Sequence, residues 1–267
     1  MADPVDRVAP PFTAIILAAQ RAGRVDPLAA AHGVSHKCLV PIVGRPLIGY
    51  VARALQATPG LAALRVVIEP EVVETVRRLL PPGPAPVEFV AAADNLADSV
   101  RAGAAGLDLA MLITTADNVL LTPPAARAMV EAMAAGADVT LAMASKASVM
   151  AAHPQGQRRY YRFSDDEYSN CNLYGLAGAK ALAAAEIFRS GGQFAKKKSR
   201  LIMAIGPINL LLFRFGRLSL AGAMRRMGRR FRLRIVPVII ADGSHAIDVD
   251  NERTYDAAAT LLAARPG

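Results

Sequence analysis

Short apolar runs alternate with amphipathic stretches along the first half of the chain. The run Phe12–Ala19 is apolar almost without interruption, which is typical of a strand buried on both faces. Further strands are predicted at Leu64–Ile68, Val87–Ala91, Met111–Thr115 and Asp138–Ala144. Helical patterns separate them, at Pro46–Gln56, Glu71–Leu80, Leu96–Ala105 and Pro123–Ala134. This alternation predicts an α/β protein with a Rossmann-like, mostly parallel sheet flanked by helices.

The second half of the chain is less regular. Strands are predicted at Arg159–Phe163, Cys171–Leu176 and Leu233–Ile240, and helices at Ala177–Phe188 and Asn251–Ala264. No stretch rich in Gly and Ser, or in Pro, separates the two halves. We therefore expect residues 1–267 to form a single domain with a basic helical insertion at about 190–232.

Charge is distributed unevenly along the chain, whose formal net charge is +9. Thirteen Lys or Arg and no Asp or Glu lie between Ile187 and Ala241, whereas the rest has 18 basic and 22 acidic residues. Within this basic segment, the stretch Arg217–Arg230 has the pattern of an amphipathic helix. Its apolar stripe consists of Leu220, Ala223, Met224 and Met227, and its basic side of Arg225, Arg226, Arg229 and Arg230.

Two interpretations of the basic segment have equal weight at this stage. Residues 196–234 could bind an anionic membrane surface, with Leu220, Met224 and Met227 inserting into it. Alternatively, the apolar stripe packs on the body of the protein or on a second subunit, which leaves a homodimer open. Nucleic acid is disfavoured because no aromatic stacking platform accompanies the charge.

The expected compartment is the cytoplasm, with the protein peripheral at the inner membrane face. The N-terminal sequence has neither a basic n-region nor an apolar h-region. The two cysteines, Cys38 and Cys171, are too few for a disulfide framework or a four-cysteine zinc site.

Polar side chains follow several of the predicted strands. The loop Gln20–Arg24 follows the first strand, Asp117 follows Met111–Thr115, and Asp248 and Asp250 follow Leu233–Ile240. Ligands of parallel α/β sheets bind beyond the carboxyl ends of the strands. Two carboxylates beside cationic side chains suit Mg²⁺ and phosphate, since Mg²⁺ is usually held by one or two carboxylates and phosphate oxygens.

Several stretches occur in an order that resembles the nucleotidyltransferases of the MobA-like and sugar-phosphate type. The family pattern is L-A-A-G-x-G-x-R followed by K-x-L-x-x-x-x-G-x-P-L, and the chain has LAA at 17–19, Arg24, and KCLVPIVGRPLI at 37–48. The resemblance continues through Asp98–Gly103 and Asp117 to the sequence IDVD at 247–250. The stretch at 37–48 is specific, whereas the others are weak signals when taken alone.

The resemblance implies an Mg²⁺-dependent transfer from a nucleoside triphosphate, with CTP or GTP slightly favoured. The phosphate of a small alcohol, sugar or lipid-headgroup precursor attacks the α-phosphorus and releases pyrophosphate. Arg24 and Lys37 correspond to the catalytic cations, and Asp117 and Asp250 to the metal ligands. Asp248 is the less favoured ligand, expected behind the other two. The matching nucleotide-binding positions are Ala18, Ala19, Gln20, Arg21, Gly23, Asp94, Asn95 and Ser99, and those beside the acceptor are Asn170 and Asn172.

The chain departs from the family pattern in two places, and these departures leave alternatives open. Gln20 and Ala22 replace the two loop glycines, and Asp117 is followed by Asn118-Val119 instead of the usual x-Pro. A related glycosyltransferase that uses a nucleotide-sugar, or a catalytically inactive membrane-associated binding module, are the other functions considered. Individual residues also have structural interpretations: the three aspartates could cap helices, and a β-turn fits Asn170 and Asn172 equally well.

Overall fold

The computed structural model describes residues 9–20, 25–182, 215 and 217–265. Its main sheet has eight strands in this part of the chain, and seven of them follow the order β10-β7-β9-β6-β1-β4-β5. Strand β1 (Phe12–Leu17) is central and pairs in parallel with β4 (Leu61–Ile68) and β6 (Ala110–Thr115). Strand β5 (Val87–Ala91) forms one edge, in parallel with β4.

The other half of the sheet contains its one long antiparallel strand among the described residues. Strand β9 (Glu167–Leu176) lies antiparallel between β6 and β7 (Val139–Ser145), and β10 (Ile235–Ile239) pairs in parallel with β7 at the second edge. The short β8 (Tyr161–Arg162) pairs with β9. The prediction of a mostly parallel α/β sheet is confirmed.

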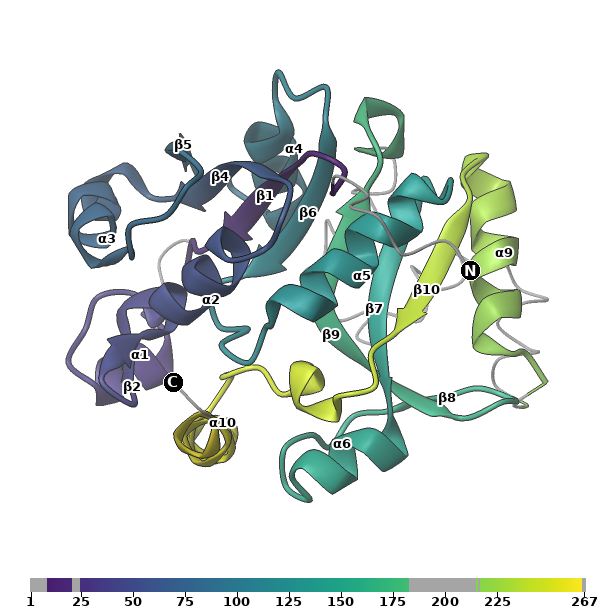
Figure 1. Cartoon of the computed structure of the whole chain (residues 1–267). Helices are drawn as coiled ribbons and strands as arrows, with labels where there is room; N and C mark the ends of the chain where they lie inside the picture. The colour runs from purple at the N-terminus through teal and green to yellow at the C-terminus, as the bar shows by residue number, and fades with distance from the viewer. Residues whose placement is uncertain (1–8, 21–24, 183–214, 216, 266–267) are drawn as a thin grey trace, which may run out of the picture.

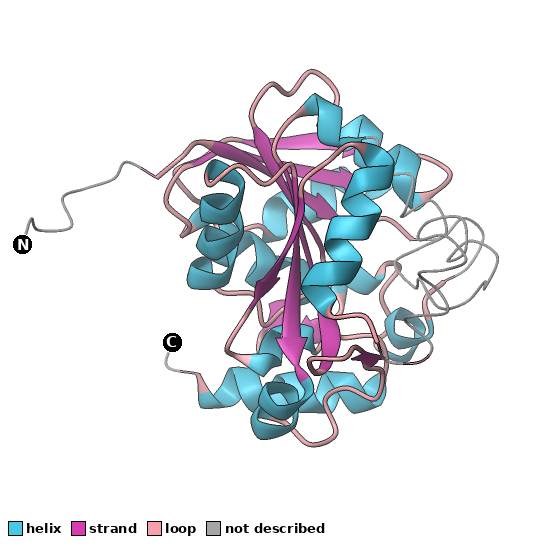
Figure 2. Ribbon diagram, turned by 90° about the vertical axis from the view of Figure 1, so that its right-hand side faces the viewer, coloured by secondary structure: helices cyan, strands magenta, loops and turns pink. Residues whose placement is uncertain are grey.

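Helices cover both faces of the sheet, as the two perpendicular views show (Figures 1 and 2). On one face, α2 (Leu47–Gln56), α3 (Val73–Leu79), α5 (Pro123–Ala134) and α10 (Glu252–Ala264) contribute to the larger apolar cluster. On the other face, α4 (Leu96–Ala104) and α9 (Leu220–Phe231) contribute to the second cluster. Ala14 and Ile16 of β1 belong to the first cluster and Ile15 to the second, so β1 is buried on both faces.

The short elements were not predicted, because each has too few residues to show a periodic pattern. They are α1 (Pro27–Ala31), the hairpin of β2 (Pro41–Ile42) and β3 (Arg45–Pro46), α6 (Lys146–Ala152), and the 3₁₀ turns η1 (Lys37–Leu39), η2 (Pro70–Val72) and η4 (Gly243–Ala246). Of the predicted helix Ala177–Phe188, the described part ends at Leu182 and contains a 3₁₀ turn over residues 179–182. The remainder lies outside the described residues.

The amphipathic helix within the basic segment is present as α9, but its apolar stripe is not available to a membrane. Leu220, Ala223 and Met227 are buried, and Met224 is half-buried against the same clusters. The stripe packs on the body of the protein, close to β10. Of the two interpretations left open, insertion of Leu220, Met224 and Met227 into a membrane is therefore wrong, because folding already buries Leu220 and Met227 and half-buries Met224. Within the described residues, no helix combines the length and apolar character needed to cross a bilayer.

Candidate active site

The chain order of the strands places a topological switch point between β1 and β6. After β1 the chain adds β4 and then β5 on one side, and it returns with β6 to the other side. Helices cross over in opposite directions at such a switch point, which leaves a space at the carboxyl ends of the two strands. Gln20 follows β1 on one side of this point, and Asp117 follows β6 on the other. The candidate active site is built around these two strand ends.

The specific stretch at 37–48 presents one charged side chain to the site, and most of its other residues hold the backbone in place. Lys37 begins the turn η1. Gly44 in the following hairpin has φ of 77°, a conformation that glycine adopts without strain. Tyr50 stabilises this hairpin by donating a hydrogen bond from its hydroxyl to the carbonyl of Val43 at 2.8 Å. Leu47 is fully buried where α2 begins.

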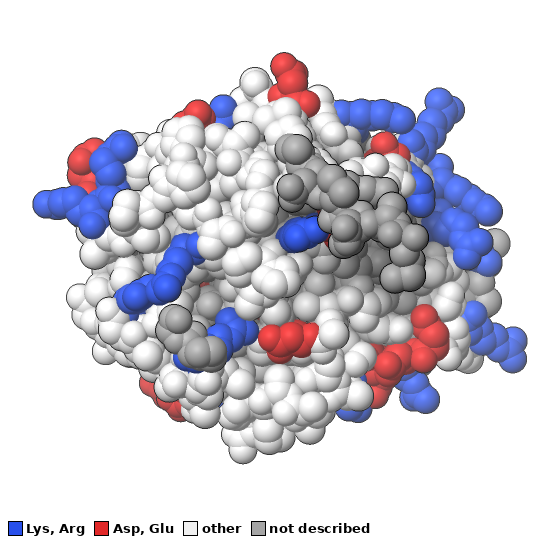
Figure 3. Space-filling view, in the orientation of Figure 1, with Lys and Arg blue, Asp and Glu red and all other residues white. Residues whose placement is uncertain are grey.

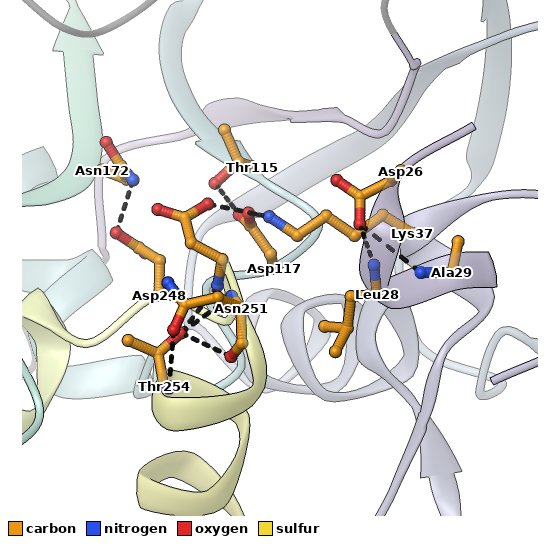
Figure 4. A network of polar contacts seen from close by, with 11 residues as sticks. Asp26, Leu28, Ala29, Lys37, Thr115, Asp117, Asn172, Asp248, Asn251 and Thr254 are labelled. Atoms are coloured by element: carbon orange, nitrogen blue, oxygen red, sulfur yellow. Dashed lines mark hydrogen bonds and ion pairs between the residues drawn. The ribbon is translucent and has the colours of Figure 1, made fainter. Parts of the chain in front are cut away.

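Lys37 lies between two of the predicted carboxylates. Its ammonium contacts Asp117 Oδ2 and lies 2.9 Å from Asp250 Oδ1. Figure 4 shows the Lys37 side chain extended towards Asp117. Burial by itself lowers the pKa of Lys37, but the two carboxylates outweigh it and raise that pKa above the usual lysine value. The lysine is therefore held in its charged form.

The two aspartates come from distant parts of the chain, and backbone contacts bring them together. The backbone N–H of Val249 donates to the carbonyl of Asp117 at 3.1 Å, which joins the segment after η4 to the end of β6. Thr115 donates from its hydroxyl to Asp117 Oδ1. The Asp117 side chain is only 14% exposed, whereas that of Asp250 is 63% exposed. Asp117 thus has a fixed orientation, and Asp250 faces solvent across the same lysine.

Asp248 is the buried member of the acidic group. Asn172 donates from its side-chain amide to Asp248 Oδ2 at 2.5 Å, and Asp248 Oδ1 accepts no hydrogen bond from the described residues. Burial raises the pKa of Asp248 well above its usual range, and the charges of Asp117 and Asp250 raise it further. Asp248 lies behind the Lys37 contact rather than in it.

Asn170 and Asn172 belong to strand β9 and not to a β-turn, so the β-turn interpretation is wrong. Asn172 has φ of 45°, in the left-handed region, at an irregularity in the pairing of β9 with β7. The side chain of Asn170 accepts the backbone N–H of Asn172 at 3.0 Å and donates to the hydroxyl of Tyr174. This local network turns the Asn172 amide towards Asp248 and the site.

None of the three aspartates caps a helix, so the capping interpretation is also wrong. The N-cap of α10 is Asn251, which forms a capping box with Thr254. The hydroxyl of Thr254 also accepts the backbone N–H of Asp250 at 2.9 Å. The N-cap of α5 is Thr122, without a side-chain cap. Figure 4 shows this start of α10 next to Asp248.

The predicted nucleotide-binding residues lie along the carboxyl ends of β1 and β5. Ala18, Ala19 and Gln20 follow β1, and Ala18 is buried. After β5, Asp94 is exposed, while the other two candidates have structural contacts. Asn95 caps α4, and the Ser99 hydroxyl accepts the N–H of Ala93 at 3.0 Å. Arg21, Gly23 and Arg24 lie outside the described residues, so their roles stay predictions.

Glu69 is a residue of this edge that the sequence-based prediction did not include. It directly follows β4, and its Oε1 accepts the backbone N–H of Gln20 at 2.8 Å. Its other oxygen lies 3.5 Å from Nε2 of the buried His36, next to Lys37. Glu69 therefore joins the end of β1 to the turn that carries Lys37. A signal was available, because a carboxylate close to the end of a strand was the criterion that identified Asp117.

Two carboxylates, not three, converge on one point within the described residues. No group of three or more His, Cys, Asp or Glu side chains is gathered there as a metal site. Asp117 and Asp250 nevertheless flank a single cation, the Lys37 ammonium, and two carboxylates with phosphate oxygens and water are enough for Mg²⁺. Their donor chemistry fits a divalent cation that is completed by its substrate.

Comparisons with known proteins identify the family of the chain. The family model of the MobA-like NTP transferase domain matches residues 14–201. No curated protein matches the chain.

Among solved structures, a hypothetical transferase from Thermus thermophilus is 27% identical with a TM-score of 0.73, and the match covers 92% of this chain and 99% of the other. The 4-diphosphocytidyl-2C-methyl-D-erythritol synthase of Anaerococcus prevotii has a TM-score of 0.60 at 11% identity, with 96% and 99% covered. A CMP:2-keto-3-deoxy-manno-octonic acid synthetase in complex with CTP has a TM-score of 0.55 at 14% identity, with 95% and 98% covered. The last two show the shared fold alone. On the family match and the nucleotidyltransferase fold, the chain belongs to the nucleotidyltransferases with a MobA-like NTP transferase domain.

Proposed function

We propose that the protein joins a nucleoside triphosphate to a phosphorylated small molecule and releases pyrophosphate. The observation that supports this most is Lys37 held between Asp117 and Asp250 at the switch point of the sheet. A phosphate oxygen of the acceptor forms a bond to the α-phosphorus, and the bond from that phosphorus to the bridging oxygen of pyrophosphate breaks. Such a transfer requires positioning and charge neutralisation rather than a protein nucleophile.

The residues of the site divide into cationic and anionic roles. Lys37 binds the triphosphate oxygens and stabilises the charge that develops on them, and Arg24 is proposed to assist it. Asp117 and Asp250 would hold Mg²⁺, which supplies charge neutralisation and orientation for the phosphates when it is bound. Asp117 is the more rigid of the two because Thr115 and the buried strand end fix it.

The acceptor is proposed to bind on the β9 side of the switch point. Asn170 and Asn172 lie there, and the Asn172 amide is already fixed by Asp248. The sequence supports a phosphorylated alcohol, sugar or lipid-headgroup precursor as the class of acceptor. Asn172 then has a positioning role, because it orients Asp248 behind Asp117 and Asp250.

Thermal unfolding of the full chain with Mg²⁺ and each of the four nucleoside triphosphates tests this function. A ligand at 100 times its Kd stabilises the folded state by about 2.7 kcal/mol, so at least one triphosphate should raise Tm clearly. Pyrophosphate release with a panel of phosphorylated alcohols and sugars then tests the reaction.

The same experiment distinguishes the alternatives. If nucleotide-sugars stabilise the protein and their sugar is transferred, while no triphosphate binds, the chain is a glycosyltransferase. If triphosphates bind but are neither transferred to an acceptor of the panel nor hydrolysed by water, the result favours a catalytically inactive binding module. Pyrophosphate release from any triphosphate excludes that interpretation.

We also propose that the basic face of α9 binds an anionic membrane surface through charge alone. Arg225, Arg226, Arg229 and Arg230 are all exposed on this helix. Figure 3 shows Lys and Arg side chains gathered on the side of the molecule where Figure 1 places α9. Each cation near an anionic leaflet contributes about 1 kcal/mol. Because the apolar stripe of α9 is buried, the binding has no insertion component.

Co-sedimentation with liposomes tests the membrane proposal. The wild type should pellet with vesicles that contain phosphatidylserine, and less so as salt is raised, because exposed charges are screened within about 10 Å at 0.1 M. A variant with glutamine at the four arginine positions should stay in the supernatant. Equal pelleting of both proteins would contradict the proposal. A variant Met224→Gln should pellet like the wild type, since the proposal excludes insertion.

A further inference from the structure

Two buried acceptor oxygens at the carboxyl ends of the neighbouring strands β1 and β4 accept no hydrogen bond from the described residues. They are the side-chain carbonyl oxygen of Gln20 and the Oε2 atom of Glu69, which has Nε2 of His36 at 3.5 Å. The two residues are joined, because the backbone N–H of Gln20 donates to the other oxygen of Glu69 at 2.8 Å. Buried acceptors without donors destabilise a free protein and are rare without a reason.

The position of these oxygens indicates which part of a nucleotide would meet them. This step rests on the proposed function, that is, on triphosphate binding at Lys37. The Glu69 carboxylate repels phosphate, whereas Lys37 and a cation between Asp117 and Asp250 attract it. The triphosphate should therefore lie at the β6 side of the switch point. The uncharged nucleoside then extends over the ends of β1 and β4, where Gln20 and Glu69 lie.

The chemistry of the two groups selects among nucleobases. Both oxygens are pure acceptors and need N–H or O–H donors. Cytosine and adenine each present an amino group, and guanine presents an amino group next to a ring N–H. Uracil offers a single N–H between two carbonyl oxygens, and these oxygens would face the Glu69 carboxylate.

We propose that Gln20 and Glu69 bind the donor edge of an amino-bearing nucleobase and discriminate against uracil. Gln20 stands where the family pattern has a glycine, so in this chain a side-chain acceptor is present where the pattern has none. The replacement thereby contributes to base selection. The ribose hydroxyls are the other donors of a nucleoside, and the test separates them from the base.

Calorimetric titration of the full chain with CTP, GTP, ATP and UTP tests the proposal, with Mg²⁺ present and no acceptor. The tightest amino-bearing triphosphate should bind at least about tenfold more tightly than UTP, the loss expected when buried acceptors stay unpaired. Gln20→Leu removes one acceptor and keeps the backbone N–H that binds Glu69. Glu69→Gln replaces a carboxylate oxygen with a donor. In each variant, the ratio of the Kd for UTP to the Kd for the tightest amino-bearing triphosphate should fall to about threefold or less.

Two controls accompany these variants. Glu71→Gln removes the same charge from an exposed side chain two residues away, and it should leave the ratio unchanged. The 2′-deoxy form of the best triphosphate should bind within about threefold of the ribonucleotide, because a single exposed hydroxyl contributes little. If Glu69→Gln does not fold, Gln20→Leu alone decides the question.

Three results would overturn the inference while leaving the proposed function intact. The first is that UTP binds as tightly as the best amino-bearing triphosphate. The second is that the ratio of the two dissociation constants is unchanged in every folded variant. The third is that the 2′-deoxy form loses as much affinity as UTP does. The last result would assign the two oxygens to the ribose. Binding of no triphosphate at all would be distinct, since it overturns the proposed function and this inference with it.

Discussion

The carboxylate site and the basic face of α9 are both strongly charged, yet they are built in opposite ways. In the site, Lys37 contacts Asp117 and Asp250, which are 80 and 213 residues away along the chain. Lys37 and Asp117 are largely buried. On α9, four arginines within six consecutive positions all face solvent, and the helix has no acidic residue.

This difference separates two uses of charge. Opposite charges held in contact and partly removed from water have a fixed geometry, and their interaction changes strongly when one partner is removed. Like charges on a solvated face produce a diffuse field that salt screens and that no single residue dominates. Substitutions in the two regions should therefore differ by orders of magnitude in their effects on turnover.

The largest effect is expected from Asp117→Asn. The change removes a carboxylate charge but keeps the shape of the side chain, so turnover should fall by about 10³-fold or more through loss of charge stabilisation. Turnover of the Asp250→Asn variant should fall less, because Asp250 is the more exposed carboxylate. Pyrophosphate release and its Mg²⁺ dependence are the measurements. Glu131→Gln on α5, an exposed carboxylate, is the matched control, and wild-type rates in Asp117→Asn would refute its role.

The second effect concerns Lys37→Ala, which should lower kcat by about 10²-fold and change KM much less. The reason is that the lysine stabilises charge that develops only during transfer. Steady-state kinetics separate the two constants. A change confined to KM would mean that Lys37 binds ground state and transition state equally.

The pH dependence of stability provides a second measurement on Lys37. The carboxylates raise its pKa in the folded state above the usual value of 10.5. The ammonium thus contributes stability that is fully present below pH 10.5 and is lost as pH rises through the higher folded-state pKa. Denaturant unfolding should show a difference in the free energy of unfolding between the wild type and Lys37→Met that shrinks as pH rises through this alkaline range.

A smaller effect is expected at Asn172, where two substitutions separate its two properties. Asn172→Gly keeps the left-handed backbone and removes the amide that binds Asp248, so turnover should fall by about tenfold through loss of positioning. Asn172→Ala adds backbone strain, so it should also destabilise the fold, by about 1 kcal/mol. Unfolding free energy and kcat are measured for both. Full activity in Asn172→Gly would mean that Asp248 needs no orientation.

The smallest effect is expected on α9. Replacing Arg225, Arg226, Arg229 and Arg230 with Gln should change kcat/KM for soluble substrates less than about twofold, because exposed charges far from the reacting atoms contribute little. The variant should also unfold within about 0.5 kcal/mol of the wild type. A large loss of turnover in solution would show that the two charged regions are not independent.

The fold and much of the site were predictable because they depend on local patterns. Buried parallel strands appear as continuous apolar runs, and the strand-end criterion placed Asp117 correctly at the sheet edge. The antiparallel direction of β9 was not predictable, since a strand pattern carries no direction. The stripe of α9 was predicted correctly, but the choice between its possible partners stayed open, because the same stripe suits a membrane and the body of the protein. The position of Glu69 after β4 was a signal that was not used, whereas its contact with Gln20 was not predictable because it spans 49 residues.

The contact between Lys37 and Asp250 also has a consequence for the order of events during synthesis on the ribosome. Strands β1, β4, β5 and β6, together with Lys37 and Asp117, are translated within the first half of the chain. Asp250 and the docking helix α10 are translated after all of these strands, and the hydroxyl of Tyr255 in α10 then donates to the carbonyl of Pro41 in the first hairpin. A nascent chain that has already formed most of its sheet therefore still lacks its second carboxylate. If Asp250 has its proposed role, turnover requires α10 to be translated and to pack against the first hairpin.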